Sequence, residues 1–196
     1  MNAIDLHIHS VYSDSSLSLS DILTSVKEKN LHTISITDHD TFACYKYLQE
    51  YSLPCAIVKG IEISAFDETL QKPVHILGYG FGEDTPHVDA LCATTLQHRL
   101  KASLWQIEQL KKHGYKITKE EVETLAIDST AIYKQHIMDV MMKHGYSDGI
   151  YSDVYRKLFK NNGICEYSIP YVSVTEAIRA IHADHGIAVL AHPYLS

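Results

Sequence analysis

The sequence predicts an α/β fold with mostly parallel strands and an all-helical insertion. Up to residue 85, and again after residue 171, short apolar or β-branched segments alternate with segments of helical periodicity. No convincing strand pattern occurs between these positions. The 196 residues, of which 45% are hydrophobic, suffice for one substantial core. We therefore expect an α/β domain formed by residues 1–85 and 172–196, with a helical insertion formed by residues 86–171.

Each element of the first part follows from a local pattern. Ile4–Ser10 has the alternation expected of a half-buried strand. Ser20 is a suitable N-cap for a helix over residues 20–30, and the β-branched segment Thr33–Thr37 is typical of the next strand. Pro54 ends a helix expected over residues 41–51. Two further strands are expected at residues 55–58 and 74–79.

The helical block and the last unit have equally clear boundaries. A long helix from His87 to His113 is stopped by Gly114, and Thr118 with Glu121 forms a capping box for the next helix. Further helices are expected over residues 130–144 and 153–162. After the block, a helix over residues 173–185 and an apolar strand over residues 187–190 return to the first pattern.

Composition excludes several classes of protein. A formal net charge of −7 argues against binding of long nucleic acid on a broad basic face. Binding of a mononucleotide or a short oligonucleotide is compatible with this charge. The four cysteines are far apart and form no C-x-x-C pair, so neither a zinc knuckle nor a disulfide framework is indicated. The sequence contains no long apolar run and no signal-peptide pattern, which predicts a cytoplasmic protein without membrane contact.

The first strand carries the first candidate metal ligands. His7 and His9 share one face of this strand because alternate side chains of a strand point the same way. Two imidazoles at this spacing suit one zinc, iron or manganese ion, and Asp14 is placed to hold a second ion. The alternative is a chance alternation of two histidines. Ligand-type residues at the ends of later strands favour the metal site.

These strand ends are expected to form one site, because the carboxyl ends of strands meet at the active sites of parallel α/β folds. Five histidines and two carboxylates exceed the four ligands of one zinc ion and suit two or three ions, with Glu62 or a water bridging them. Clustered ions deprotonate a bound water and neutralise phosphate oxygens, which predicts hydrolysis of a phosphate ester by metal-bound hydroxide. The candidate ligands are His7, His9, Asp14, His39, Glu62, His75 and His192.

Two residues of the helical block are candidates for contact with phosphate. His136 lies on a predicted helix beside Lys134 and is a candidate phosphate contact or catalytic acid. Arg99 lies on the long helix, and a guanidinium suits phosphate, with a solvated surface position as its alternative. The remaining seven histidines fall on predicted helices or their ends, where structural or solvent contacts account for them.

Five segments together resemble the successive motifs of the polymerase and histidinol phosphatase (PHP) superfamily. The match spans essentially the whole chain. The order of the motifs and the long helical insertion are most similar to a branch of small phosphoesterases, which act on nucleoside 3',5'-bisphosphates and on the 5' ends of short RNA. The segments that carry the resemblance are Asp5–Ser10, Ser13–Asp14, Thr37–Thr41, Gly60–Ser64 and Leu190–Pro193.

The resemblance implies a distorted (β/α)7 barrel of the PHP type with a trinuclear site for manganese, iron or zinc. Asp38 and Asp40 would assist catalysis by orienting metal-bound histidines. The implied ligands are His7, His9 and Glu62 for the first ion, Glu62, His75 and His192 for the second, and Asp14 and His39 for the third.

The chain departs from the family pattern in two places. An Asp-x-His motif usually follows Leu190–Pro193 by some tens of residues, whereas this chain ends at Ser196. The resemblance therefore implies a barrel truncated at its C-terminus, without one ligand of the first ion and one of the third. The family's Arg-Pro-His motif corresponds here to Lys134–His136, which keeps the histidine but not the arginine.

The predicted function is metal-dependent hydrolysis of a phosphomonoester of a small substrate. This substrate is expected to be a nucleoside 3',5'-bisphosphate or the 5' end of a short oligonucleotide. Two alternatives stay open, a histidinol-phosphate-type phosphatase and a catalytically impaired fragment that binds metal or nucleotide. A zinc amidohydrolase is disfavoured because no lysine lies at a strand end to bridge its metals.

Overall fold

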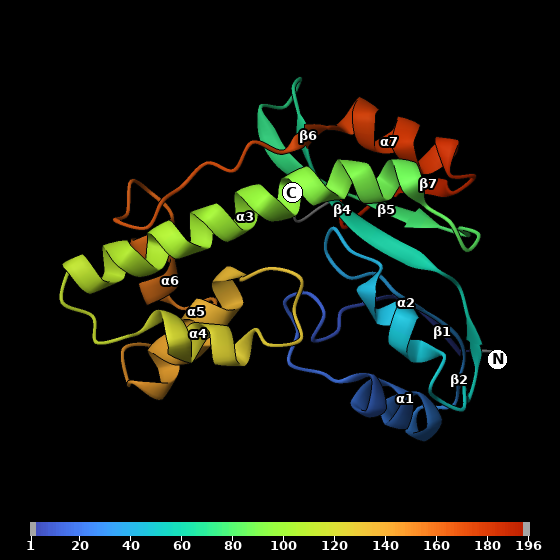
Figure 1. Ribbon diagram of the computed structural model, residues 1–196, viewed down its shortest axis with the longest axis horizontal. Helices are drawn as coiled ribbons and strands as arrows, with labels where there is room; N and C mark the ends of the chain where they lie inside the picture. The colour runs from blue at the N-terminus through green and yellow to red at the C-terminus, as the bar shows by residue number, and fades with distance from the viewer. Residues whose placement is uncertain (1–2, 194–196) are drawn as a thin grey trace. The chain divides into compact units, whose positions relative to one another are not determined.

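The computed structural model describes residues 3–193 of the chain. Within this range the chain forms seven strands and seven helices, arranged in two compact units (Figure 1). The first unit contains the described residues up to Thr95 and those from Tyr171 onward, and the second contains Leu96–Pro170. All strands of the described range belong to the first unit, which therefore carries the α/β part of the fold.

The first sheet and its covering helices are formed by β1 (Ala3–Ile8), α1 (Leu19–Glu28), β2 (Leu31–Ile36), α2 (Ala43–Leu48) and β3 (Ala56–Ile57). The three strands are parallel, in the order β1-β2-β3. Ile34 and Ile36 of the central strand are fully buried against the apolar faces of α1 and α2. This packing fixes the carboxyl ends of β1 and β2 next to each other.

The second sheet is formed by β4 (Gly60–Asp67), β5 (Lys72–Tyr79), β6 (Val172–Ser173) and β7 (Ile187–Leu190), in the order β6-β4-β5-β7. The expectation of mostly parallel strands is wrong for this sheet, because β5 is antiparallel to both β4 and β7. Only residues 68–71 separate β4 from β5, and such a short connection permits only an antiparallel pair. Asp67 stabilises the turn by accepting hydrogen bonds from the amides of Thr69 and Leu70, at 2.8 and 3.0 Å.

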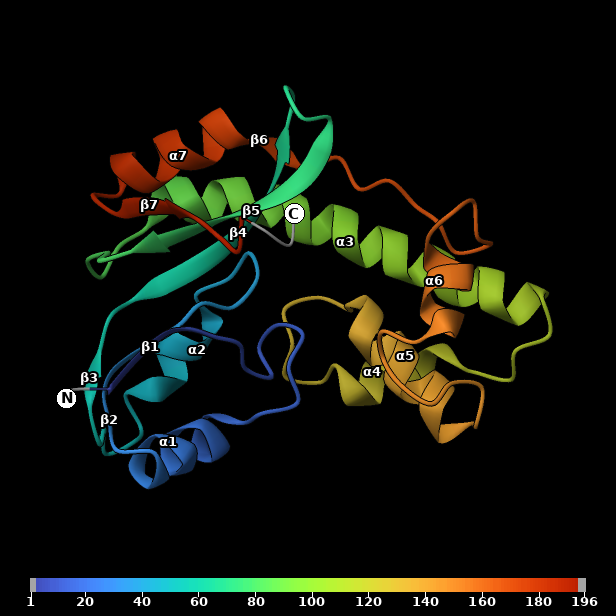
Figure 2. The same ribbon diagram turned by 180° about the vertical axis from the view of Figure 1, so that it is seen from behind.

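Two helices cover the apolar face of the second sheet, α7 (Val174–Ala183) and the first turns of α3 (Pro86–Lys112). Figure 2 shows both helices beside β5 and β7, with β4 running from β2 to this sheet. Asp184, just after α7, caps the start of α3 by accepting hydrogen bonds from the amides of His87 and Val88. The capping carboxylate thus joins two helices that are far apart in the sequence.

The second unit contains the rest of α3 together with α4 (Lys119–Leu125), α5 (Lys134–Lys143) and α6 (Asp153–Phe159). Its helices enclose an apolar core of their own, which includes Ile107, Leu110 and Met138. The predicted capping box at the start of α4 is confirmed, since Thr118 and Glu121 exchange both hydrogen bonds.

Most of the predicted helices and strands are present in the structure, but several of them begin or end at other residues than predicted. The first helix is capped by Ser18 and not by Ser20, because the Ser18 hydroxyl accepts the amide of Asp21 and the Asp21 carboxylate accepts the amide of Ser18. The two-residue strand β6 was missed. It pairs with Ala65 and Phe66 of β4, and so short a segment shows no strand periodicity of its own.

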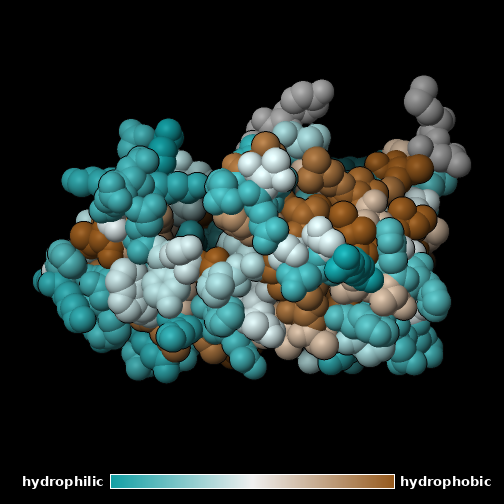
Figure 3. All heavy atoms as spheres, turned by 90° about the horizontal axis from the view of Figure 1, so that it is seen from above, coloured by the Kyte–Doolittle hydropathy of each residue, from teal (hydrophilic) through white to brown (hydrophobic). Residues whose placement is uncertain are grey.

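The outer strands of the two sheets leave apolar side chains exposed. Ile4 and Leu6 of β1 and Ile187, Val189 and Leu190 of β7 are all more than one third exposed. Apolar residues also gather on the face of the molecule drawn in Figure 3. Among the described residues, no helix combines the length and the apolar character needed to span a lipid bilayer.

Candidate metal centre

Five strands converge in the first unit through backbone hydrogen bonds. The amide of Thr37 donates to Ile8 at 2.7 Å, which joins the ends of β1 and β2. Residues 38–40 continue β2 beside β4, where the amide of Asp40 donates to the carbonyl of Glu62 at 3.0 Å. The amide of Ala191, after β7, donates to the carbonyl of His75 on β5 at 3.0 Å. Each predicted ligand other than Asp14 is therefore carried by a strand or by its immediate continuation.

Glu62 lies at the centre of these side chains and is 1% exposed. Its Oε2 atom is 3.1 Å from His7 Nε2 and 3.0 Å from His9 Nε2. The same oxygen is 3.5 Å from His39 Nδ1. The other oxygen, Oε1, is 3.1 Å from His75 Nδ1 and 3.0 Å from His192 Nε2. The two oxygens of one carboxylate thus face two different sets of imidazoles.

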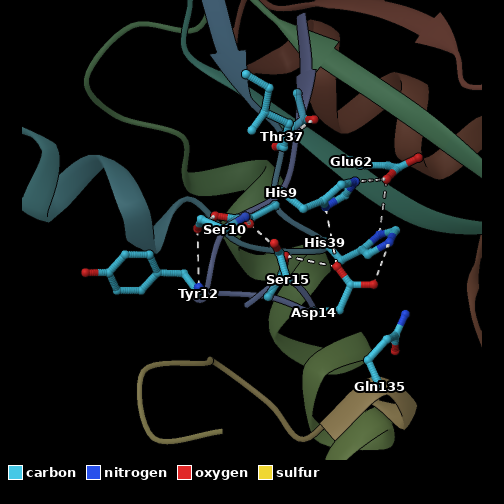
Figure 4. Close-up of polar contacts among 12 residues, drawn as sticks. His9, Ser10, Tyr12, Asp14, Ser15, Thr37, His39, Glu62 and Gln135 are labelled. Carbon is cyan, nitrogen blue, oxygen red and sulfur yellow. Dashed lines mark hydrogen bonds and ion pairs between the residues drawn. The ribbon is translucent and has the colours of Figure 1, made fainter. Parts of the chain in front are cut away.

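Asp14 completes the set from the loop after β1. Its Oδ1 atom is 3.6 Å from His9 Nδ1, and its Oδ2 atom is 3.8 Å from His39 Nε2. In Figure 4, His9, His39 and Glu62 point toward one another, and the Asp14 carboxylate faces the two histidines. The structure therefore brings together all seven predicted ligands, which come from positions 7 to 192 of the sequence.

The spacing of these atoms fits divalent ions. Two ligand atoms that each lie about 2.1 Å from one ion are about 3.0 Å apart at a right angle and about 3.4 Å apart in a tetrahedron. The contacts of Glu62 with the imidazoles span 3.0 to 3.5 Å, and the facing nitrogens of His7 and His9 are 3.2 Å apart. Nitrogens and carboxylate oxygens are ligands that zinc, manganese and iron accept.

Three groups of ligand atoms are close enough to hold an ion each, with all atoms of a group within 4.8 Å of one another. The groups share Glu62 and His39, as expected of ions with bridging ligands. They divide the histidines differently from the partition that the family resemblance implies, and that partition stays a prediction. The groups are His7, Glu62 and His192; His9, Asp14 and His39; and His39, Glu62 and His75.

The electrostatics of the centre favour an anionic Glu62. Burial alone would raise the pKa of this carboxyl, but hydrogen bonds from His7, His75 and His9 outweigh burial and hold the pKa well below its usual range. For His9, burial opposes protonation, yet the hydrogen bond to Glu62 and the charge of Asp14 give a raised pKa. Among the described residues, the ion pairs of Glu62 are all with histidines, and a divalent cation held between these groups would balance its charge.

Asp38 and Asp40 flank His39, and serine residues donate hydrogen bonds to both carboxylates. Asp38 accepts from the Ser10 amide at 2.7 Å and from the Ser13 hydroxyl at 2.6 Å. Asp40 accepts from the amide and the hydroxyl of Ser64, at 2.8 and 2.9 Å. Both carboxylates are buried, and both fix backbone segments that carry metal ligands. Their predicted role of orienting histidine rings stays a prediction.

The sequence analysis assigned no role to the serines that donate hydrogen bonds to these carboxylates. Ser10, Ser13 and Ser64 are buried and act as hydrogen-bond donors. Tyr79 was also missed; its hydroxyl donates to the carbonyl of Leu6 at 2.8 Å and joins β5 to β1. A small polar residue next to each ligand motif is the only signal in the sequence, and it does not identify the partner.

The two phosphate-contact candidates lie in the second unit. The Arg99 guanidinium stacks over the Tyr133 ring, 4.6 Å from its centroid. His136 is buried near the start of α5, and its Nδ1 atom accepts a hydrogen bond from the amide of Tyr133 at 3.1 Å. Burial lowers the pKa of His136 to about 4, so the ring is neutral near pH 7.

An α/β fold that brings five imidazoles and two carboxylates together is typical of a metal-dependent hydrolase. The family profile described as PHP domain matches residues 5–168, which is most of the chain. This chain therefore belongs to the PHP domain family. The predicted α/β fold, the family and the assignment as a metal-dependent phosphoric ester hydrolase are confirmed.

Two known proteins with similar sequences support this assignment. The phosphoribosyl 1,2-cyclic phosphate 1,2-diphosphodiesterase of Eggerthella lenta is 40% identical over 191 residues, covering 96% of this chain and 73% of that protein. The 5'-3' exoribonuclease Rnm of Escherichia coli is 28% identical over 194 residues, covering 96% of this chain and 64% of that protein. The chain thus spans about two thirds to three quarters of these relatives.

A solved structure agrees in fold. The crystal structure of a protein described as a metal-dependent phosphoesterase from Bifidobacterium adolescentis superposes with a TM-score of 0.85 at 26% identity. The match covers 97% of this chain and 67% of that protein. Together with the ligand groups of the centre, these findings support divalent metal ions as its occupants.

Proposed function

We propose that this chain hydrolyses a phosphate monoester of a small nucleotide, either a nucleoside 3',5'-bisphosphate or the 5' end of a short oligonucleotide. The observation that carries the proposal is the buried Glu62 carboxylate, whose two oxygens lie 3.0 to 3.5 Å from five histidines. A single carboxylate in this position is suited to bridge two ions.

The side chains of the first unit have the task of holding and spacing the ions. Glu62, with His7 and His9 on one side and His75 and His192 on the other, supplies both negative charge and nitrogen ligands. Bound divalent ions would neutralise the phosphate oxygens and lower the pKa of water at the site. Manganese, iron and zinc all accept this set of ligands.

A cationic cluster in the second unit supports an anionic substrate. The pKa of Lys134 is lowered to about 8, first by burial and then by the charges of Arg99 and Lys160. In a chain with a formal net charge of −7, positive groups that repel one another favour an anionic ligand. We infer that Arg99 and Lys134 contact a phosphate of the substrate, with Lys134 in place of the arginine that the family pattern leads one to expect.

His136 is proposed as a phosphate contact and not as the acid. Its Nδ1 atom already accepts the amide of Tyr133, so the neutral ring carries its proton on Nε2. With a pKa of about 4, the ring holds no second proton to release near pH 7. A neutral N–H can still donate a hydrogen bond to a phosphate oxygen.

A second candidate substrate is a cyclic phosphate ester of a phosphorylated ribose. The observation that favours it is the 40% identity with the Eggerthella lenta enzyme, which is named for that substrate. Both candidates combine a scissile phosphate ester with a second phosphate group. They would therefore use the same metal centre and the same kind of cationic contact.

The test is a comparison of substrates on the Mn2+-loaded chain, followed by 31P NMR. The substrates are adenosine 3',5'-bisphosphate, a 5'-phosphorylated dinucleotide, 5-phosphoribosyl 1,2-cyclic phosphate and histidinol phosphate. Metal-dependent hydrolysis of either of the first two, abolished in Glu62→Gln, is the expected result. Preference for the cyclic ester would select the second candidate. Bound ions without hydrolysis of any substrate would refute the catalytic proposal.

A further inference from the structure

Asp38 is a fully buried carboxylate whose partners are neutral donors. It accepts from the Ser10 amide at 2.7 Å, from the Ser10 hydroxyl at 2.6 Å and from the Ser13 hydroxyl at 2.6 Å. Cys44, also fully buried, adds a hydrogen bond from its thiol. Bonds of this length to an ionised group are strong, and they replace the water that the buried charge has lost.

Three of these four donors come from one loop, the segment from Ser10 to Asp14 that leaves β1. The loop closes on itself, because the amide of Ser13 donates to the carbonyl of Ser10 at 3.0 Å. The amide of Tyr12 also lies 3.3 Å from the Ser10 hydroxyl. In Figure 4 the Tyr12 ring points away from the histidines, while Asp14 faces them. Asp38 therefore holds the loop in place, and the loop in turn limits the positions that the Asp14 carboxylate can adopt.

Asp14 lies farther from its imidazole partners than Glu62 does from most of its own. It lies 3.6 Å from His9 Nδ1 and 3.8 Å from His39 Nε2, whereas Glu62 lies 3.0 to 3.1 Å from four of its five imidazoles. His9 and His39 sit on strand continuations that backbone pairing fixes. Asp14 is not part of a strand, so its position depends on the loop, in which the Ser13 hydroxyl also lies 3.4 Å from Asp14 Oδ1.

We propose that Asp38, acting through Ser10 and Ser13, is a positioning residue for Asp14, and that this buried network selectively sets the affinity of the ion held by His9, Asp14 and His39. The inference rests on the proposed metal centre. It assigns Asp38 a task different from orienting a histidine ring. It also predicts that one ion of the centre can be weakened while the ions around Glu62 stay bound.

Asp40 provides a natural comparison on the other side of His39. It binds the amide and the hydroxyl of Ser64, two residues after Glu62 on β4. Ser64 is already fixed by the β4–β5 ladder, where it pairs with His75. Loss of the Ser64 hydroxyl therefore leaves the ligands in register, whereas loss of the Ser13 hydroxyl frees a loop.

The experiment titrates Mn2+ into the metal-free chain and follows free Mn2+ by its room-temperature EPR signal. Parent, Ser13→Ala and Asp38→Asn are compared with two controls, Ser64→Ala and Ser103→Ala. Ser103 is a buried serine of the second unit whose hydroxyl donates at 2.6 Å to Ile132, so its removal matches the loss of a short buried hydrogen bond. Thermal unfolding of each variant checks that the titrated protein is folded.

For Ser13→Ala we expect one class of Mn2+ site to weaken by about 10- to 100-fold, the range typical of residues that orient a metal ligand. The other classes stay as in the parent, and both controls bind like the parent. If Asp38→Asn does not fold, the single hydroxyl removed in Ser13→Ala still decides the question.

Two results would overturn the inference alone. In one, folded Ser13→Ala binds every class of ion as the parent does; in the other, it weakens all classes together, as a general loss of structure would. A parent chain that binds no Mn2+ would instead refute the proposed metal centre, and the inference would fall with it.

Discussion

The protonation of His136 is a sensitive test of the burial of this ring in the second unit. The ring is 5% exposed, its Nδ1 atom accepts the Tyr133 amide, and burial lowers its pKa from 6.5 to about 4. An unfolded chain binds a proton at this position near pH 6.5, whereas the folded chain resists it until about pH 4. Stability is therefore intact above pH 6.5 and falls as the pH drops toward 4.

The size of this loss follows from the difference between the two pKa values. It amounts to about 3 kcal/mol in full, and to about 2 kcal/mol between pH 7 and pH 5. The matched variant is His136→Asn, whose side-chain oxygen can accept the Tyr133 amide but does not titrate in this range. We expect the difference in unfolding free energy between parent and variant to change by about 2 kcal/mol from pH 7 to pH 5, measured by urea denaturation.

A direct measurement is the NMR titration of the His136 ring. We expect half-protonation below pH 5 in the absence of ligand, and a higher pKa when inorganic phosphate is added, because a bound anion favours the imidazolium. Half-protonation near pH 6.5 would refute the neutral buried ring and would restore His136 as a candidate acid. An unchanged pKa at saturating phosphate would refute its role as a phosphate contact.

Two further variants test how the fold supports the site. Asp184→Ala removes the cap of α3 at Val88, and we expect a loss of about 1 to 3 kcal/mol in unfolding free energy at neutral pH. Hydrogen bonding outweighs burial and lowers the pKa of Asp184, so the stabilisation by this cap is present above about pH 4 and is lost in more acidic solution. A loss of unfolding free energy in Asp184→Ala that is equal at all pH values would contradict the capping role. Gly60 is the first residue of β4, and Gly60→Ala would place a Cβ atom 2.2 Å from the Ser35 hydroxyl. We expect this clash to destabilise the protein by about 1 to 3 kcal/mol and to weaken Mn2+ binding by displacing Glu62. Gly82→Ala is the control, because the space around Gly82 is open. Unaltered Mn2+ binding by Gly60→Ala would show that β4 does not fix the ligand.

The ligands of the centre could be predicted because strand geometry and strand ends are visible in the sequence. His7 and His9 share a face by simple alternation, and His39 and His192 each follow an apolar strand. The rule that strand ends converge then unites residues more than a hundred positions apart. No measurement of distance is needed for this step, only the type of element on which each residue lies.

The arrangement of the second sheet could not be predicted in the same way. The sequence analysis expected strands at residues 55–58 and 74–79, whereas β4 occupies Gly60–Asp67, so the short connection between β4 and β5 was not recognised. In the antiparallel pair, Glu62 lies opposite Leu77 and Ser64 opposite His75, which puts Glu62 and His75 on one face. The contact between them therefore depends on register, which hydrophobic pattern alone leaves undefined here.

Buried polar networks were the second feature that could not be predicted from the sequence. Ser13 and Asp38 are 25 positions apart, and nothing in their types identifies them as partners. Such pairs form because a buried carboxylate must find donors, and which donors it finds is decided by the packing of the whole unit. The acid and phosphate-contact roles of residues in the helical block likewise depend on burial, which decides that His136 is neutral.

The central claim is that Glu62 organises a cluster of divalent ions, and its most direct test is the metal content of the purified chain. Mn2+-loaded parent, Glu62→Gln and the control Glu108→Gln would be desalted and measured by elemental analysis. Glu108 is an exposed residue that pairs with Lys111 on α3, so this variant removes the same charge without altering any of the ligand groups. We expect two or more ions per chain in the parent and the control, and a loss of ions in Glu62→Gln. A parent without bound metal, or a Glu62→Gln variant that retains as many ions as the parent, would contradict the account.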